Sequence, residues 1–389
     1  MRKKPVVVSV RELTEILEQY LQAGPGLNYA VKILGHPGVG KSAVVRQVAE
    51  AQKYYFIDTR LAFKENVDLG GYPVPDVATK RMIYFRPKFI PPEEVPSGYN
   101  GILWFLDEAN RAHPTVIQTL FQIITERTCG EHPLPERTAI VLAGNLGESD
   151  STTITEFDDS ALDGRLAVFQ LKPSAQDWIP WAESEGLHPS VVRHITVFPE
   201  RLWDESNINP NPRGWHQVSQ AMKASYGIER EDSLKAYLQE HTGGTLSLII
   251  NSLVGYTGGS DFIGQVLAPR VVSTEDVLIG STVKLSALRE GSIPSEDILW
   301  ALSGVISHIR NRRRAEGWDD KDTAEKEIAN TLLFITNTRA DMRISFFYLL
   351  LRDCGIFTQV PSVLRHIGDE EARKMILNRY EEFIMEHDN

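Results

Sequence analysis

The sequence has few cysteines, no excess of positive charge and no clustered histidines. Its two cysteines, Cys129 and Cys354, are too few for a disulfide framework or a thiolate zinc site, and such scarcity is typical of a reducing compartment. The ten histidines lack the spacing of metal ligands, so no transition-metal site is expected. A net charge of −11 argues against broad, non-specific adhesion to nucleic acid or to anionic membranes.

Long apolar runs are also lacking, so neither a membrane span nor a secretion signal is expected. The apolar run Phe346–Leu351 is far shorter than a helix that crosses a bilayer. The apolar stretch near the N-terminus is interrupted at once by Arg11 and Glu12. A hydrophobic content of 42% and a charged content of 24% are those of an ordinary globular protein. We therefore expect a cytoplasmic protein of two or three domains, because 389 residues are too many for one compact core.

One stretch has a clear chemical signature, and it follows an apolar strand at 29–34. Its residues are Gly35, His36, Pro37, Gly38, Val39, Gly40, Lys41 and Ser42. The pattern G-x-x-x-x-G-K-[ST] between a strand and a helix indicates a phosphate-binding loop, in which backbone N–H groups and the helix dipole face an oxyanion. Lys41 is expected to reach the β- and γ-phosphates, and Ser42 to offer its hydroxyl to Mg²⁺. The sequence therefore predicts a site for a nucleoside triphosphate.

Two further strand ends carry polar residues suited to phosphate hydrolysis. The apolar strand Ile102–Leu106 runs into Asp107 and Glu108. We expect Asp107 to hold Mg²⁺, usually through water, and Glu108 to polarise the attacking water. A nucleotide kinase would not require a hydrolytic glutamate such as Glu108 at this point. Asn145 follows the next strand and should lie beside this pair in a parallel sheet, in reach of the γ-phosphate or the water. A turn-forming asparagine is the alternative interpretation.

The order of strand and helix patterns predicts an α/β fold with a parallel sheet. Strands are expected at 29–34, 54–59, 102–106, 139–143 and 166–171, with helical patterns between them. Such alternation places the ligand at the carboxyl ends of the strands. After residue 173 only helical patterns remain. The expected domains are an N-terminal strand and helix (1–25), the nucleotide-binding core (26–172), a helical lid (173–230) and a mostly helical C-terminal domain (231–389).

These residues resemble the ordered motifs of the AAA+ ATPases. The resemblance covers about residues 28–222 and rests on the phosphate loop, the Asp107-Glu108 pair, Asn145, Arg165 in Ser-Ala-Leu-Asp-Gly-Arg-Leu and Arg213 in Asn-Pro-Arg-Gly-Trp. More narrowly, the segment Asp-Glu-Ala-Asn-Arg-Ala-His-Pro at 107–114 resembles the D-E-I-N-R-A-P-P signature of MoxR-type ATPases. Segments between residues 59 and 89 resemble the insertion that this group carries before the Asp-Glu strand.

The resemblance implies an oligomeric enzyme. It implies a homo-oligomeric ring, commonly a hexamer, with ATP bound between subunits. Asn145 would sense the γ-phosphate, Arg165 would be the finger that reaches a neighbour's ATP, and Arg213 would be the lid arginine that contacts nucleotide in its own subunit. MoxR-type ATPases act in a chaperone-like way, often with a separate protein that carries a von Willebrand A domain. The leading prediction is therefore a Mg²⁺-dependent ATPase that remodels or activates a partner complex.

Two functions other than protein remodelling are weighed against the same residues. A DNA-acting AAA+ motor or loader is the alternative, disfavoured by the acidic charge, and a scaffold with negligible hydrolysis is disfavoured by Glu108.

The basic and aromatic segment 80–89 is interpreted as a hairpin with solvated charges, a pore-facing hairpin that grips a peptide, or a nucleic-acid contact. The cluster of Arg310, Arg312, Arg313 and Arg314 favours a solvated helix C-terminus.

Overall fold

The computed structural model describes residues 4–24, 29–147, 164–207, 209–315, 321–352 and 354–387. The chain forms two compact units, each built from two separate segments. The first unit comprises Met1–Pro180 and Glu200–Gln217, and the second comprises Trp181–Pro199 and Val218–Asn389. The domain boundaries expected at residues 172 and 230 stay predictions.

The first unit contains a six-stranded sheet in the order β1-β10-β2-β9-β6-β3, and every neighbouring pair is parallel. Its strands are β1 (Val6–Val8), β2 (Ala30–Leu34), β3 (Tyr54–Arg60), β6 (Gly101–Asp107), β9 (Thr138–Gly144) and β10 (Leu166–Leu171). The strands expected from the sequence are confirmed. The central strands read as continuous apolar runs because both of their faces are buried.

Helices cover both faces of this sheet. Helices α1 (Val10–Gln22) and α2 (Lys41–Ala51) bury their apolar stripes on one face. Helix α4 (Pro114–Glu126) buries its stripe on the other face. Successive strand residues point to opposite faces, so Ala30 belongs to the core under α4 and Val31 to the core under α1 and α2.

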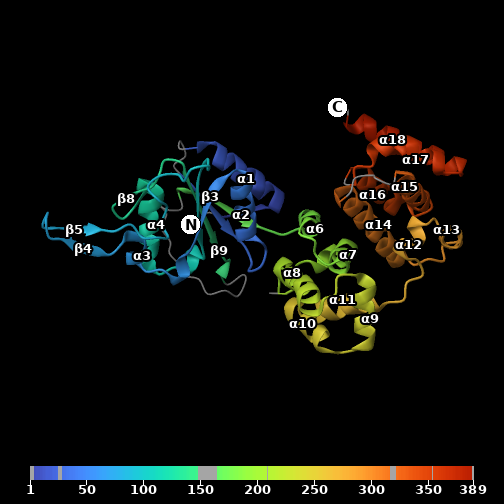
Figure 1. The fold of residues 1–389 in the computed structure, drawn as a ribbon, viewed down its shortest axis with the longest axis horizontal. Coiled ribbons are helices and arrows are strands. Elements are labelled where there is room, and N and C mark those ends of the chain that lie inside the picture. Colours follow the sequence, from blue (N-terminus) through green and yellow to red (C-terminus); the bar gives the residue numbers. More distant parts are fainter. Residues whose placement is uncertain are drawn as a thin grey trace. The chain divides into compact units, whose positions relative to one another are not determined.

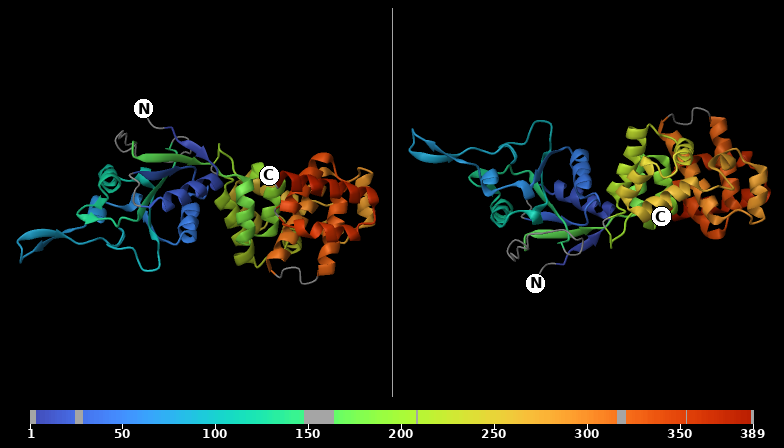
Figure 2. Two further views of the ribbon diagram at one scale, coloured as in Figure 1. Left: turned by 90° about the horizontal axis from the view of Figure 1, so that it is seen from above. Right: turned by 90° about the horizontal axis from the view of Figure 1, so that it is seen from below.

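The connection from β3 to β6 carries helix α3 (Asn66–Gly70) and an antiparallel hairpin of β4 (Pro73–Asp76) and β5 (Arg81–Tyr84). The hairpin projects away from the sheet of its unit in the views of Figures 1 and 2. Its aromatic and apolar side chains are exposed together with its charges, as Met82 and Phe85 show. The predicted hairpin is confirmed. A second, short antiparallel ribbon of β7 (Thr128–Cys129) and β8 (His132–Pro133) follows α4.

The described residues of the second unit form helices joined by turns and loops, with no strand among them. Helices α6 (Ala175–Ser184) and α8 (Pro212–Gln220) have residues in both units. The helices that lie wholly in the second unit are α7 (Pro189–Val197), α9 (Glu231–Glu240), α10 (Thr245–Val254), α11 (Tyr256–Leu267), α12 (Thr274–Leu278), α13 (Thr282–Arg289), α14 (Ser295–Ala315), α15 (Lys321–Thr336), α16 (Ala340–Arg352), α17 (Val360–Val363) and α18 (Glu370–His387). Within the described ranges, none of these helices has the length and apolarity to span a bilayer.

Apolar stripes on α14 and α15 form part of the core of the second unit. The buried members are Ile298, Leu302, Val305, Ile306, Ile309, Ile328, Leu332 and Ile335. Their spacing of three and four residues places them along one side of each helix, which confirms the helical pattern read from the sequence.

The basic cluster of α14 differs from the solvated helix end that the sequence favoured. A guanidinium nitrogen of Arg310 lies 2.6 Å from Oε2 of Glu183, and these side chains are only 11% and 5% exposed. Arg312 lies 2.7 Å from Oε2 of Glu327. The prediction is wrong for these two arginines, because α6 and α15 supply acidic partners that the spacing within α14 cannot reveal. The side chains of Arg313 and Arg314 lie outside the described part of the chain.

Candidate nucleotide-binding site

The predicted phosphate loop connects β2 to α2 at the carboxyl edge of the sheet. Gly38 and Gly40 have φ angles of 82° and 99°, in the left-handed region that glycine adopts without strain. Helix α2 begins at Lys41, with Gly40 as its N-cap and no capping side chain. An uncapped helix N-terminus behind a glycine turn is the backbone arrangement that binds phosphate.

Lys41 lies folded over this loop. Its Nζ donates hydrogen bonds to the carbonyl oxygens of Gly35 and His36, at 2.6 and 3.0 Å, and to Oδ1 of Asn145, at 3.1 Å. Lys41 is only 9% exposed, so its charge is held largely away from bulk water. Asn145 reaches the loop because β9, whose carboxyl end it follows, pairs directly with β2. Two predicted site residues that are distant in the sequence therefore meet in the structure.

A second pair, Ser42 and Asp107, joins the loop to the end of β6. Ser42 Oγ donates to Oδ2 of Asp107 at 3.2 Å, and Oδ1 of Asp107 accepts from the Glu108 N–H at 2.8 Å. A hydroxyl beside a carboxylate suits Mg²⁺, which binds through one or two protein oxygens and completes its shell with water and phosphate oxygens. Within the described ranges no group of three or more His, Cys, Asp or Glu could hold a metal ion. The hydroxyl of Ser42 and the carboxylate of Asp107 fit a cation that takes its remaining ligands from water and phosphate oxygens.

Glu108 occupies a strained turn directly after β6. Its φ angle is 54°, which is uncommon for a residue with a side chain, and such strain concentrates at functional sites. Its Oε1 lies 3.8 Å from a guanidinium nitrogen of Arg111, and the two side chains are 27% and 45% exposed. The Arg111 N–H donates to the Glu108 carbonyl at 2.9 Å and closes the turn. The carboxylate thus lies at the edge that also carries Lys41.

Strand β3 adds a third carboxylate, Asp58, near this edge. Burial, followed by the nearby charge of Asp107, raises the pKa of Asp58, while Arg60 and Arg46 oppose the rise. A guanidinium nitrogen of Arg46 lies 3.7 Å from Oδ2 of Asp58. Sequence reasoning did not single out Asp58. The signal was its place on the strand that pairs with β6, where Asp58 lies opposite Phe105.

Asn110 is the residue of the site that sequence reasoning missed most clearly. Its Nδ2 donates to the carbonyl of Asn145 at 2.6 Å, and its Oδ1 accepts from the Asn145 N–H at 3.1 Å. Gly144 lies so close that a Cβ there would be 2.6 Å from Oδ1 of Asn110. The available signal was the position of Asn110 within the motif that begins at Asp107.

The segment 200–217 of the first unit also contacts the phosphate loop. The Arg213 N–H donates to the Gly38 carbonyl at 3.2 Å. A Cβ on Gly38 would lie 2.6 Å from Oδ1 of Asn211. The rings of His36 and Trp203 meet edge to face, with centroids 5.4 Å apart. The predicted lid arginine therefore has its backbone against the loop, and its side chain is exposed.

Arg165 is not brought to this site. It precedes β10 at the amino edge of the sheet, whereas the other predicted residues lie at the carboxyl edge. Its carbonyl accepts from the Ala30 N–H at 3.0 Å, and its guanidinium lies 5.4 Å from the ring centroid of Phe121. Most of the motif that precedes Arg165 falls at 148–163, outside the described residues.

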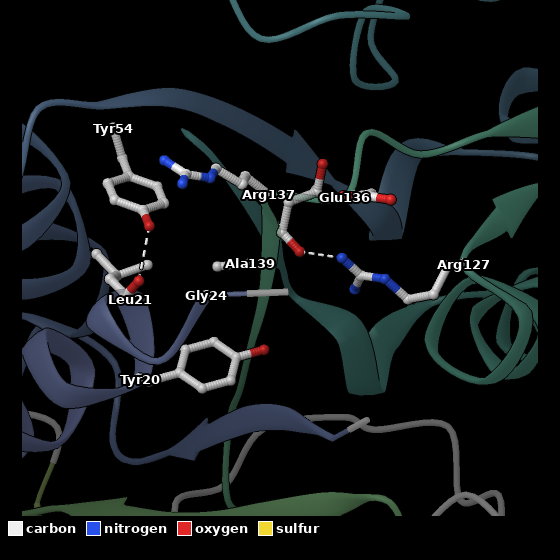
Figure 3. A pocket seen from close by; sticks show the side chains of 9 residues that line it. Tyr20, Leu21, Gly24, Tyr54, Arg127, Glu136, Arg137 and Ala139 are labelled. Atoms are coloured by element: carbon white, nitrogen blue, oxygen red, sulfur yellow. Dashed lines mark hydrogen bonds between the residues drawn. The ribbon is translucent and has the colours of Figure 1, made fainter. Parts of the chain in front are cut away.

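A small cavity also lies at the amino edge, where Tyr54 begins β3 and Thr138 begins β9 (Figure 3). Its volume of ≈ 20 Å³ has room for about one water molecule. The Tyr54 hydroxyl donates to the Leu21 carbonyl at 2.7 Å, and burial raises the pKa of Tyr20 to about 12. The cavity lies at the opposite ends of the strands from the phosphate loop and is separate from the candidate site.

The loop, the Ser42–Asp107 pair and the strand-end amide of Asn145, on a parallel sheet, have the arrangement of a P-loop nucleotide-binding core. Residues 30–141 match the family model described as "AAA domain (dynein-related subfamily)". That part of the chain is therefore similar to an AAA domain, the nucleotide-binding core of AAA+ ATPases. The predicted fold class, an α/β AAA+ core with a helical remainder, is confirmed.

Solved structures show distant similarities, and no curated protein sequence matches the chain. The Thermotoga maritima RuvB Holliday junction branch migration motor is 15% identical, with a TM-score of 0.35, and the match covers 60% of this chain and 68% of that one. NtrX from Brucella abortus in complex with ADP is 11% identical, with a TM-score of 0.36, and the match covers 90% of this chain and 68% of that one. Similarities this distant support no functional conclusion.

Proposed function

We propose that this protein is a MoxR-like AAA+ ATPase that hydrolyses ATP to remodel or activate a partner protein. One observation carries the catalytic part of this proposal. Lys41 and Ser42 begin α2 after the loop that follows β2, whereas Asp107 ends β6 and Asn145 follows β9. Hydrogen bonds of 3.2 Å or less connect Lys41 to Asn145 and Ser42 to Asp107. Such convergence on a glycine loop is suited to binding the triphosphate of a nucleotide.

The residues then divide the hydrolytic work. Lys41 and the loop amides bind the β- and γ-phosphates, and Ser42 and Asp107 would hold Mg²⁺, which when bound neutralises phosphate charge. Glu108 accepts a proton from the attacking water as the water oxygen bonds to the γ-phosphorus. The bond from that phosphorus to the bridging oxygen breaks, and ADP and phosphate leave. Asn145 orients the γ-phosphate or the water.

The proposed partner is a protein, and the proposed assembly is a homo-oligomeric ring. The hairpin β4–β5 supports a protein partner, because adjacent exposed apolar side chains mark contact surfaces. Its residues Met82, Ile83 and Tyr84 are all at least 37% exposed. By resemblance, a separate protein with a von Willebrand A domain is a candidate partner. Arg165 supports a ring because its place at the amino edge, away from the phosphate loop of its own subunit, suits contact with another subunit's ATP.

Two substitutions test the catalytic assignment. Lys41→Ala should abolish ATP binding, because it removes the charge that faces the phosphates. Glu108→Gln should bind ATP with near-normal affinity and hydrolyse it very slowly, because the amide cannot accept the proton. Equilibrium binding of a fluorescent ATP analogue and release of phosphate measure the two effects separately. Near-normal turnover by Glu108→Gln would refute the proposed base.

The ATP-bound Glu108→Gln protein also tests the proposed partner. A motor arrested with ATP should hold its partner, so affinity capture in ATP should enrich specific proteins that Lys41→Ala does not retain. Stimulation of turnover by a captured protein supports remodelling. Stimulation by DNA instead of by protein would favour the DNA-acting alternative.

A further inference from the structure

We infer that Asn110 is a positioning residue that ties the backbone of Asn145 to the turn carrying Glu108, so that ATP turnover depends on Asn110 and ATP binding does not. This inference rests on the proposed ATPase function. The Asn110 side chain directs its hydrogen bonds to the backbone of Asn145, so its effect on chemistry must pass through Asn145 and Glu108.

The Asn110 side chain acts as a substitute for a strand partner. Backbone pairing between β6 and β9 ends in register at Leu106 opposite Leu142. Beyond that point, the Asn110 amide satisfies both the N–H and the C=O of Asn145, at 3.1 and 2.6 Å. One donor and one acceptor on a single planar group fix the orientation of a peptide more closely than one hydrogen bond does. Asn110 thus extends the connection between the two strands beyond their backbone pairing.

Gly144 makes this contact possible. A Cβ at Gly144 would lie 2.6 Å from Oδ1, 2.8 Å from Cγ and 3.1 Å from Nδ2 of Asn110. Contacts under 3.0 Å to an amide held by two hydrogen bonds cannot be relieved by a small shift of its free end. The glycine therefore leaves room for the Asn110 amide to lie against the end of β9.

The two hydrogen bonds between Asn110 and the Asn145 backbone, here called the clamp, connect Asn145 to the turn that carries Glu108. The proposed reaction requires the side chains of Asn145 and Glu108 in fixed geometry. On one side, the Asn145 Oδ1 accepts from Lys41 Nζ at 3.1 Å. On the other, Asn110 lies in the short turn Ala109–Arg111, which Arg111 closes back onto Glu108 at 2.9 Å. Lys41 keeps its bonds to the carbonyl oxygens at the start of the loop without the clamp, so ATP affinity should survive. A misplacement of about 1 Å in catalytic groups can cost ~10²-fold in rate.

Asn110→Ala is the first test, with Asn100→Ala as its matched control. Asn100 also donates through Nδ2 to a backbone carbonyl, that of Gln52 at 2.9 Å, but it does so near the amino edge. Asn110→Ala should lower kcat by about 10- to 100-fold and change the ATP dissociation constant less than about threefold. Asn100→Ala should change neither. Equal losses in kcat and affinity, or an unchanged kcat in Asn110→Ala, would overturn the inference.

A double-mutant cycle with Gly144 separates positioning from general damage. Gly144→Ala as a single substitution should lower kcat, because the added Cβ displaces the Asn110 amide. In the Asn110→Ala background the amide is gone, so Gly144→Ala should cost far less, and the two losses should be strongly non-additive. Losses that simply multiply would show that the residues act independently and would contradict the clamp.

Amide hydrogen exchange gives a readout that does not depend on turnover. The Asn145 N–H is bonded to Asn110, so peptides spanning 144–146 should exchange faster in Asn110→Ala and at the original rate in Asn100→Ala. If the unsubstituted protein showed no ATPase activity, the proposed function would fail while this measurement still tested the clamp. Unchanged exchange in Asn110→Ala would refute the clamp by itself.

Discussion

Gly38→Ala should destabilise the first unit more than the same substitution at left-handed glycines where an added Cβ would meet open space. Gly38 has a φ angle of 82°, and an added Cβ would lie 2.6 Å from Oδ1 and 2.9 Å from Cγ of Asn211. Asn211 cannot move away freely, because its Oδ1 also accepts from the Gly214 N–H at 2.9 Å. The substitution therefore combines backbone strain with a steric clash.

Two control glycines in the same unit isolate the strain. Gly98 and Gly40 have φ angles of 88° and 99°, and an added Cβ at either would have no atom within 4 Å. Left-handed backbone costs a residue with a Cβ roughly 1–2 kcal/mol. Overpacking at a tight contact costs about 1–3 kcal/mol more. Gly38→Ala should thus cost ~2–5 kcal/mol, and each control only the first part.

Calorimetric unfolding in the absence of nucleotide measures this difference. For a unit of this size 1 kcal/mol shifts the midpoint by about 2–4 °C, so Gly38→Ala should melt roughly 2–12 °C below Gly98→Ala. Asn211→Ala removes the clash, and in that background the Gly38 and Gly98 variants should differ much less. Equal midpoints for the two single variants, or a gap that survives in Asn211→Ala, would refute the reasoning.

Two further predictions concern assembly and the second unit. If Arg165 acts on a neighbour's ATP, turnover per subunit should rise with protein concentration. Glu108→Gln subunits should also partly restore turnover to Arg165→Ala subunits, since such a finger is worth about 10³–10⁵ in rate. A protein that light scattering shows to be a monomer, with turnover independent of concentration, would contradict this prediction. Glu183→Gln removes the carboxylate from the buried pair with Arg310 at 2.6 Å, which should lower the free energy of unfolding by about 3–5 kcal/mol in calorimetry. Glu15→Gln, in a pair with Arg11 whose side chains are 61% and 73% exposed, should cost ~0.5 kcal/mol or less. Equal losses in the two variants would contradict the role of burial.

The sequence predicted which candidate residues would lie together where each of them is local to a strand end. The phosphate loop needs glycines at fixed spacing because the backbone itself binds the ligand, so its residues are legible in order. Asp107 and Asn145 were also predictable, because parallel strands bring their carboxyl ends to one edge. Strand bounds were accurate for a related reason: apolar runs that are buried on both faces stand out from their flanks.

Ion pairs between distant elements were not predictable from spacing. Arg310 and Arg312 look like a solvated cationic helix end, since cations are favoured there by the helix dipole. Their partners Glu183 and Glu327 lie in α6 and α15, and only the packing of the helices brings them within 2.7 Å. A sequence pattern shows the charge of each helix but not which helix is its neighbour.

The role of Asn110 was also not predictable from its residue type alone. It lies shortly after Asp107 in a turn, where asparagine is common for local reasons, so its type alone does not distinguish a turn former from a clamp. The distinction comes from Gly144, whose missing Cβ leaves room for the amide. A glycine at the end of a buried strand weakens that strand and usually marks a bulge or a close approach of another group. Read together, Gly144 and Asn110 explain each other, whereas either residue read alone favours only an ordinary turn.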